Sequence, residues 1–152
     1  METEDIQNII KSISTESKNF FINDMQLEII SQCDIPTCLP TDHFTFIKLS
    51  SDLSFVVCFD IDEKLFNVLF DKFFVDGVED DEKDELVDAL PDEIINIVVG
   101  LAIRAFPVDY NESELGLPMK LDKNQITELY KSGTPYSHQI TTNKGKLTFS
   151  II

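Results

Sequence analysis

The chain has 152 residues, and its 28 acidic side chains against 12 lysines and arginines give a formal net charge of −16. Nucleic-acid-binding proteins neutralise phosphates with clustered basic residues, and Arg104 is the only arginine here, so we expect neither nucleic acid nor an anionic membrane as partner. No apolar run is long enough for a membrane span, and the acidic N-terminus does not read as a secretory signal. We therefore expect a cytoplasmic protein of one domain, residues 1–152, that favours a basic protein surface.

Residues for catalysis or metal binding are few. The three cysteines follow no C-x-x-C pattern, so we expect reduced thiols and no metal site. His43 and His138 lie in predicted strands without a recognisable nucleophile motif, which is typical of surface or edge histidines. No glycine-rich phosphate loop is present.

The first half of the chain predicts a helix, a short strand and a hairpin, followed by a second helix. Asp60 or Asp62 is expected to cap that second helix, and Gly77 to end it. The expected ranges are 3–22 (helix), 25–32 (strand), 43–50 and 53–60 (hairpin strands) and 62–75 (helix).

The second half starts with an acidic run, 79–85, that leads into a long amphipathic helix, 86–106, in which Pro91 predicts a kink or a restart. The expected elements after it are a short edge strand at 117–121, a helical turn at 123–131 and a closing hairpin at 136–142 and 146–152. This order predicts an α+β fold, an antiparallel sheet with long amphipathic helices packed on one face. Each end of the chain has a helix followed by strands and a hairpin, which suggests an internal duplication.

The long helix carries the main candidate site. Its apolar residues predict one buried face: Leu86, Leu90, Ile94, Ile97, Val98, Leu101 and Ala105. Glu93, Asn96 and Gly100 follow at i, i+3 and i+7 on another stripe, with Ala89 and Ala102 near it, so a partner could approach closely there. The bare E-x-x-N spacing also occurs at Glu16 and Asn19, so the spacing alone is weak evidence for a site. On this evidence Glu93 and Asn96 can also be exposed polar positions of an amphipathic helix.

The longer pattern E-x-x-N-x-x-x-G, within DELVDALPDEIINIVVG, resembles the CheC/CheX chemotaxis phosphatases, CheX more closely. The resemblance covers most of the chain in pattern and order: the N-terminal helix, the hairpin, FDIDEKLFNVLFDKFF before the acidic run, and LGLPMKL before the closing strands. It implies a CheC-like fold for the predicted sheet and helices.

The resemblance also implies a function in chemotaxis or two-component signalling. The protein would be a hydrolase that removes the aspartyl phosphate of a CheY-type response-regulator receiver. Glu93 would dock on a receiver lysine, Asn96 would position the attacking water, and Asp92 and Gly100 would contact the partner. The chain would need no cofactor, because the receiver holds the magnesium. Glu16 and Asn19 are a possible second site, since CheC proteins carry two such sites, whereas CheX proteins carry one and Phe20 and Phe21 beside Asn19 suggest packing instead. A homodimer would form through a sheet edge, as in CheX proteins.

Two other interpretations remain at this stage. A CheX-like module could bind a receiver or another signalling protein without hydrolysing anything. Alternatively, an acidic inhibitor or mimic could occupy a basic protein surface by charge alone.

Overall fold

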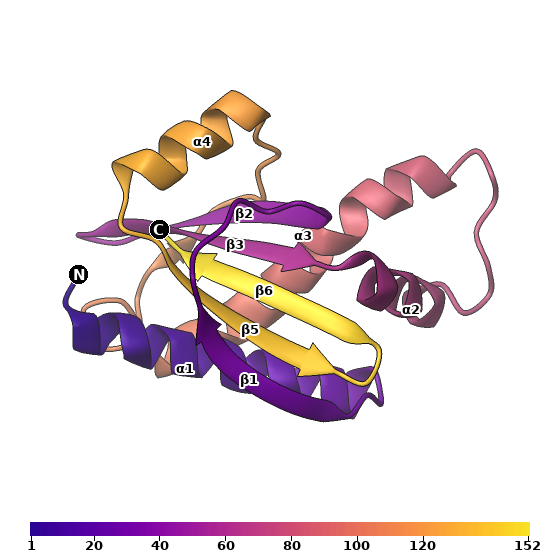
Figure 1. The fold of residues 1–152 in the computed structure, drawn as a ribbon, viewed down its shortest axis with the longest axis horizontal. Helices are drawn as coiled ribbons and strands as arrows, with labels where there is room; N and C mark the ends of the chain where they lie inside the picture. The colour runs from indigo at the N-terminus through magenta and orange to yellow at the C-terminus, as the bar shows by residue number, and fades with distance from the viewer.

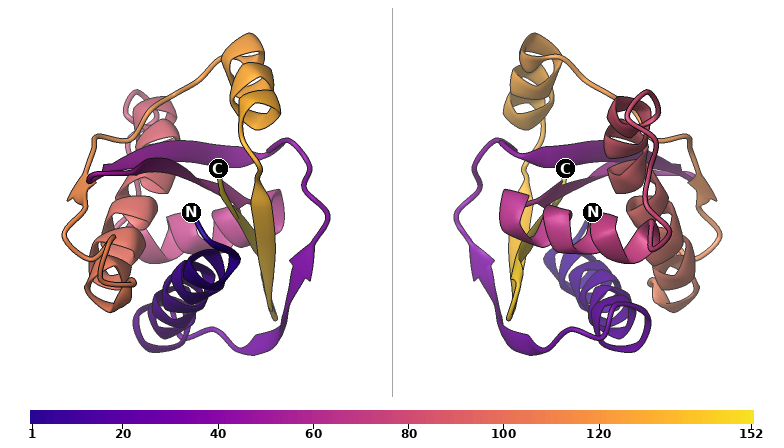
Figure 2. Two further views of the ribbon diagram at one scale, coloured as in Figure 1. Left: turned by 90° about the vertical axis from the view of Figure 1, so that its left-hand side faces the viewer. Right: turned by 90° about the vertical axis from the view of Figure 1, so that its right-hand side faces the viewer.

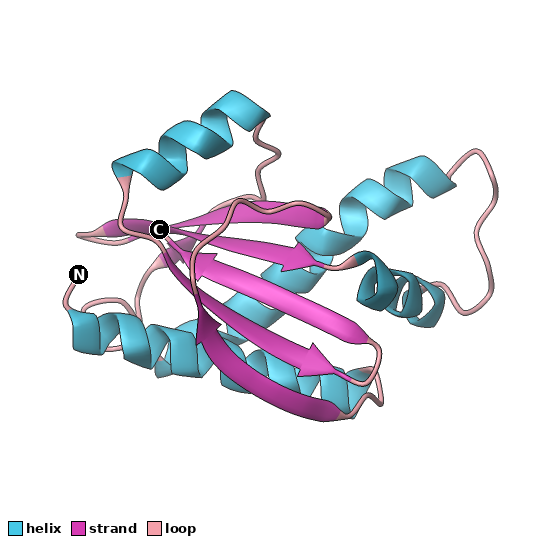
Figure 3. Cartoon of the chain, viewed as in Figure 1, coloured by secondary structure: helices cyan, strands magenta, loops and turns pink.

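The structure is a computed structural model that describes all residues, 1–152, and it contains one antiparallel sheet with helices on both faces (Figure 1; Figure 3). The helices are α1 (Thr3–Asn19), α2 (Glu63–Phe73), α3 (Lys83–Ala102) and α4 (Lys123–Ser132), with a π-helical turn η1 (Phe20–Asp24) after α1 and a 3₁₀ turn η2 (Ile103–Ala105) after α3. The strands are β1 (Ile29–Ile35), β2 (His43–Ser50), β3 (Ser54–Ile61), β4 (Glu114–Leu115), β5 (Tyr136–Thr142) and β6 (Gly145–Ile151).

The sheet has the order β1-β5-β6-β3-β2-β4, and every neighbouring pair is antiparallel. This order is symmetric. If the labels β1, β2 and β3 are swapped with β4, β5 and β6, the same order is obtained when the sheet is read from its opposite edge. The two halves, α1-β1-β2-β3 and α3-β4-β5-β6, therefore have matching topology, which is consistent with the predicted duplication; the duplication itself stays a prediction.

The main core lies between one face of the sheet and helices α1, α2 and α3. Figure 2 shows the sheet curving around these three helices, with α4 on the opposite, outer face. A smaller cluster under α4 contains Phe46, Cys58 and Ile126. Tyr130 of α4 packs against that cluster, and burial raises the pKa of both its phenol and the Cys58 thiol. The predicted α+β fold with long helices on one face is confirmed, and α4 is the short helix on the other face.

Most predicted elements form close to their expected bounds. The Asp62 carboxylate caps α2 by accepting from the Leu65 amide at 2.8 Å. Helix α3 runs through Pro91 without a restart. The predicted strand 25–32 is wrong in its bounds, because the turn at η1 and a positive φ at Gln26 delay the strand to Ile29. The edge strand expected at 117–121 forms earlier, as β4, and continues along β2 only as a bridge from Met119 to Phe46.

The buried face of α3 differs from the predicted one. The buried residues are Leu90, Pro91, Ile94, Ile95, Val98, Val99 and Ala102. Leu101 and Ala105, both expected inside, are exposed, and Ala102, expected near the polar stripe, lies in the core. The two faces differ by roughly 75° of rotation about the helix axis. The run IINIVVGLAI is apolar almost all round, so its periodicity alone left the rotation undetermined.

The environment of His138 also differs from the expectation. It lies in β5, inside the sheet, with only 8% of its surface exposed. Its Nδ1 lies 2.8 Å from an Asp34 oxygen of β1, and its Nε2 faces Gln32, which in turn accepts from Ser14 of α1. This polar cluster connects α1, the edge strand and β5.

No helix in the structure is long and apolar enough to cross a membrane.

Candidate functional site on helix α3

The surface of α3 that faces away from the core carries a single line of residues. Ala89, Glu93, Asn96 and Gly100 follow one another at four, three and four residues, and at 100° per residue these positions lie opposite the buried face. Ala89 and Glu93 are exposed, whereas Asn96 and Gly100 are half-buried. We call these four residues the α3 line. The structure thus brings three of the predicted site residues, Glu93, Asn96 and Gly100, onto one outward-facing surface.

The functional groups of the α3 line are free within the protein. Glu93 takes part in none of the ion pairs, which are His43–Glu63, Lys120–Asp92 and His138–Asp34. The Asn96 carboxamide makes no side-chain hydrogen bond inside the chain, so its oxygen and its amide group are both available to an external partner. A carboxylate and a carboxamide one helical turn apart can therefore contact the same bound molecule.

At the Gly100 end of the α3 line no side chain projects from the helix, and apolar side chains lie nearby. A Cβ at Gly100 would meet only Leu115 Cδ2, at 3.8 Å, so the position has open space above it. Leu101, next along the helix, is 45% exposed, and Leu117, two residues after Leu115, is 86% exposed. Exposed leucines beside an open helix surface are typical of a protein contact.

Asp92, predicted to contact a partner, lies on the flank of the helix and is engaged by the chain itself. Its Oδ1 accepts from Thr45 Oγ1 of β2 at 2.6 Å and lies 3.0 Å from Lys120 Nζ. Lys120 Nζ also donates to the Asp88 carbonyl at 2.9 Å. Sequence reasoning missed Thr45 and Lys120 at this site; the only signal was a threonine two residues before Ile47 and four before Leu49, on the same face of the strand.

Glu16 and Asn19, the second candidate pair, lie in a different setting. Glu16 is half-buried beside a hollow that is also lined by Ala105, Phe106 and Pro107. Asn19 is exposed at the last residue of α1, immediately before the π-helical turn. The same spacing therefore places only Asn19 outward, with Glu16 at the border of the buried face.

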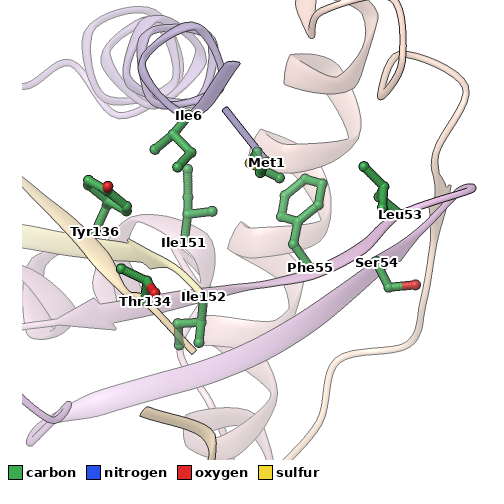
Figure 4. A pocket seen from close by; sticks show the side chains of 9 residues that line it. All are labelled: Met1, Ile6, Leu53, Ser54, Phe55, Thr134, Tyr136, Ile151 and Ile152. Carbon is green, nitrogen blue, oxygen red and sulfur yellow. The ribbon is translucent and has the colours of Figure 1, made fainter. Parts of the chain in front are cut away.

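Pockets lie both beside α3 and elsewhere on the molecule. A hollow of about 370 Å³ is lined by Val87, Asp88 and Pro91 of α3 and by Lys120, and it contains no residue of the α3 line. A pocket of about 440 Å³ lies where the N-terminus, the β2–β3 hairpin and the C-terminus meet. Figure 4 shows its mostly apolar lining, which includes no residue of α3: Met1, Ile6, Leu53, Ser54, Phe55, Thr134, Tyr136, Ile151 and Ile152. No group of three or more His, Cys, Asp or Glu side chains is placed to hold a metal ion, and the cysteines are free thiols. The α3 line is an open helix surface, which suits a protein partner better than a small molecule.

The fold is that of the CheC/CheX-type chemotaxis proteins. Similar solved structures include a CheC-like superfamily protein from Shewanella sp. PV-4, with a TM-score of 0.69 and 17% identity over 99% of this chain and 97% of that one. CheX from Desulfovibrio desulfuricans has a TM-score of 0.64 and 12% identity, over 95% and 97% of the two chains. CheX in a CheX–CheY–BeF₃–Mg²⁺ complex from Borrelia burgdorferi has a TM-score of 0.64 and 14% identity, over 96% and 95%. No family model and no curated protein matches the chain.

Proposed function

We propose that this protein is a phosphatase for the aspartyl phosphate of a CheY-type receiver in chemotaxis or two-component signalling. The observation that carries the proposal is the pairing of Glu93 with Asn96 on the outward-facing α3 line, in a fold shared with CheX. One similar CheX was crystallised with CheY, BeF₃ and Mg²⁺, which supports a receiver as the partner.

The hydrolysis requires few functional groups from this chain. Water attacks the phosphorus, the bond between phosphorus and the aspartyl oxygen breaks, and the receiver regains its carboxylate as inorganic phosphate leaves. Magnesium and a lysine of the receiver neutralise the phosphoryl oxygens, so this chain needs no cofactor of its own. The Asn96 carbonyl oxygen accepts a hydrogen bond from the water and thereby orients the attack, and the proton that the water loses leaves with the phosphate.

Glu93 and the flanking residues provide the docking. The exposed Glu93 carboxylate pairs with a receiver lysine, and Gly100 lets the receiver approach the helix backbone. Leu101, the next residue of the helix, and Leu115, whose side chain lies beside Gly100, add apolar contact at the same end. The acidic run 79–85, which extends into the first turn of α3, and the net charge of −16 favour a receiver with basic residues around its active site.

A homodimer is part of the proposal. The edge strand β1 offers seven residues for pairing, whereas β4, at the other edge, has two. A second copy could therefore extend the sheet at β1, away from the α3 line.

The first test is phosphate release from a phosphorylated receiver of the same cell. Wild-type protein should accelerate release, and Asn96→Ala should lose about a hundredfold of that acceleration, because the water is no longer oriented. Binding to the BeF₃-activated receiver should persist in Asn96→Ala. Asn124→Ala, an exposed asparagine of α4, is the matched control and should behave as wild type.

Other outcomes separate the alternatives. Binding without acceleration by the wild-type protein would establish a non-catalytic receiver-binding module. Binding that ignores the activation state and collapses with salt would indicate an acidic mimic. Asn19→Ala tests the second pair: unchanged release with this variant would leave Asn96 as the sole water-positioning residue.

A further inference from the structure

We infer that Thr45, Asp92 and Lys120 form a clamp that sets the rotation of α3 and thereby aims Asn96, with Thr45 and Lys120 as positioning residues. The inference rests on the proposed function for its catalytic consequence, but its structural claim can be tested without activity. Asp92 comes directly before Glu93, so a bond that fixes Asp92 also fixes the middle of the α3 line, at Glu93.

The clamp joins three segments of the chain at one carboxylate oxygen. Thr45 Oγ1 reaches Asp92 Oδ1 from β2 at 2.6 Å, and Lys120 Nζ reaches the same oxygen at 3.0 Å from the segment after β4. Thr45 is completely buried. A buried hydroxyl without a hydrogen-bond partner is costly, so the Thr45 hydroxyl favours the helix orientation that keeps Asp92 within reach.

Thr45 departs from the pattern of its own strand. The inward-facing positions of β2 that follow it, Ile47 and Leu49, are fully buried and apolar. A hydroxyl in that series adds nothing to apolar packing, and valine would fill the same space. Such local departures from the packing rule are expected where a side chain has a specific task.

Pro91 explains why α3 needs the clamp at this turn. Proline has no amide hydrogen to donate to the carbonyl four residues earlier, and its ring crowds that carbonyl, so the turn before Glu93 is weakened. Lys120 donates to the Asp88 carbonyl in this same turn. The lysine therefore supports the helix backbone and the Asp92 carboxylate together.

Apolar packing favours the observed rotation of α3, which buries Ile95 and Val99, but the helix is apolar enough on other faces that a directional bond adds to the choice. The face predicted from periodicity differs from the observed face by roughly 75°, and it would also bury apolar residues, including Leu101. In that orientation Asp92 would point to solvent and lose Thr45. The directional Thr45–Asp92 bond exists in only one of the two orientations, so it adds to the preference for the observed one and sharpens it.

The rotation has a direct effect on catalysis. A turn of roughly 75° would carry the Asn96 carboxamide several ångströms sideways, whereas water positioning fails with a misplacement of about 1 Å. Loosening the clamp should therefore lower kcat while the receiver still binds through the other contacts of the helix.

The test compares Thr45→Val with Thr45→Ser, and adds Lys120→Met. Thr45→Val removes the hydroxyl at constant size; we expect kcat for phosphate release to fall about tenfold or more, with KM within about threefold of wild type. Thr45→Ser keeps the hydroxyl and should restore kcat. Lys120→Met should have a smaller effect, because the lysine side chain is half exposed. Thr148→Val is the matched control, since Thr148 bonds Gln139 within the sheet and makes no bond to α3.

Hydrogen–deuterium exchange provides the readout that does not depend on activity. Amides 92–97 should exchange faster in Thr45→Val than in wild type, and not in Thr45→Ser or Thr148→Val. Unchanged exchange in Thr45→Val would overturn the clamp. If wild-type protein accelerates no receiver, the proposed function fails, and the exchange result still decides whether the clamp sets the helix. If kcat is unchanged while exchange rises, the clamp holds the helix but does not position Asn96.

Discussion

Glu93 and Asn96 belong to one motif but differ in exposure, and this difference suits the different tasks that we propose for them. Glu93 is exposed, whereas Asn96 is half-buried on the α3 line. An exposed carboxylate contributes modestly to binding, since solvent screens its ion pairs. A carboxamide with restricted freedom is better suited to orient one water molecule. The two substitutions should therefore affect different kinetic constants.

Glu93→Gln keeps the size of the side chain and removes its charge. We expect KM for the phosphorylated receiver to rise about two- to fivefold, the range of an exposed ion pair, with kcat changed less than twofold. Steady-state phosphate release over a range of receiver concentrations measures both constants. Glu128→Gln, an exposed glutamate of α4, is the control. A large loss of kcat at constant KM would place Glu93 in the chemical step instead.

At the scale of the element, α3 carries a glycine that its own fold does not require. Glycine inside a helix destabilises the protein by about 0.5–1 kcal/mol relative to alanine. Gly100 has no positive φ, and a Cβ there would meet a single side-chain atom at van der Waals distance. Nothing inside the chain therefore requires a glycine at this position, and the proposed approach of a receiver to the helix backbone would account for it.

Gly100→Ala and Gly100→Leu test this reading. The alanine variant should fold and gain about 0.5–1 kcal/mol in the free energy of unfolding, measured with urea. The leucine variant should fold as well but bind the activated receiver at least tenfold more weakly, because its side chain projects into the contact. Asn67→Leu, at an exposed position of α2, controls for added bulk and should bind normally. Undiminished binding by Gly100→Leu would remove Gly100 from the interface.

At the scale of the whole molecule, the two edges of the sheet differ. The β4 edge is short, and the bridge from Met119 covers part of β2 beyond it. The β1 edge is long and its residues are mostly exposed, with Cys33 and Asp34 in its second half. Long exposed edges favour pairing with another strand, so the dimer is expected there.

Cys33→Asp should disrupt that dimer. Two antiparallel β1 strands related by a two-fold axis bring the same few residues close together, so added carboxylates beside Asp34 repel each other. Wild-type protein should sediment at about twice 17.3 kDa and the variant at the monomer mass. Cys38→Asp, in the loop after β1, is the control and should remain dimeric. A monomeric wild-type protein would contradict the dimer without affecting the α3 line.

Local sequence determined the kinds of element and the candidate motif. Hairpin strands, the cap at Asp62 and the helix up to Pro107 depend on alternation, capping and proline chemistry within a few residues, so they could be predicted. The E-x-x-N-x-x-x-G spacing placed Glu93, Asn96 and Gly100 on one helix stripe for the same reason. Element bounds were less accurate where a turn had no clear signal, as at Gln26.

Only the tertiary structure decided how α3 is rotated and what surrounds it. The apolar run around Asn96 allows more than one buried face, and the choice depends in part on Thr45, 47 residues before Asp92 in the chain, and on Lys120. The burial of His138 likewise depends on Asp34, 104 residues away. A periodic pattern reports only neighbours along the helix or strand, whereas directional bonds between distant segments fix rotation and register. The sequence by itself therefore determined which residues could act, and the packing of β2, α3 and the segment after β4 decided where they point.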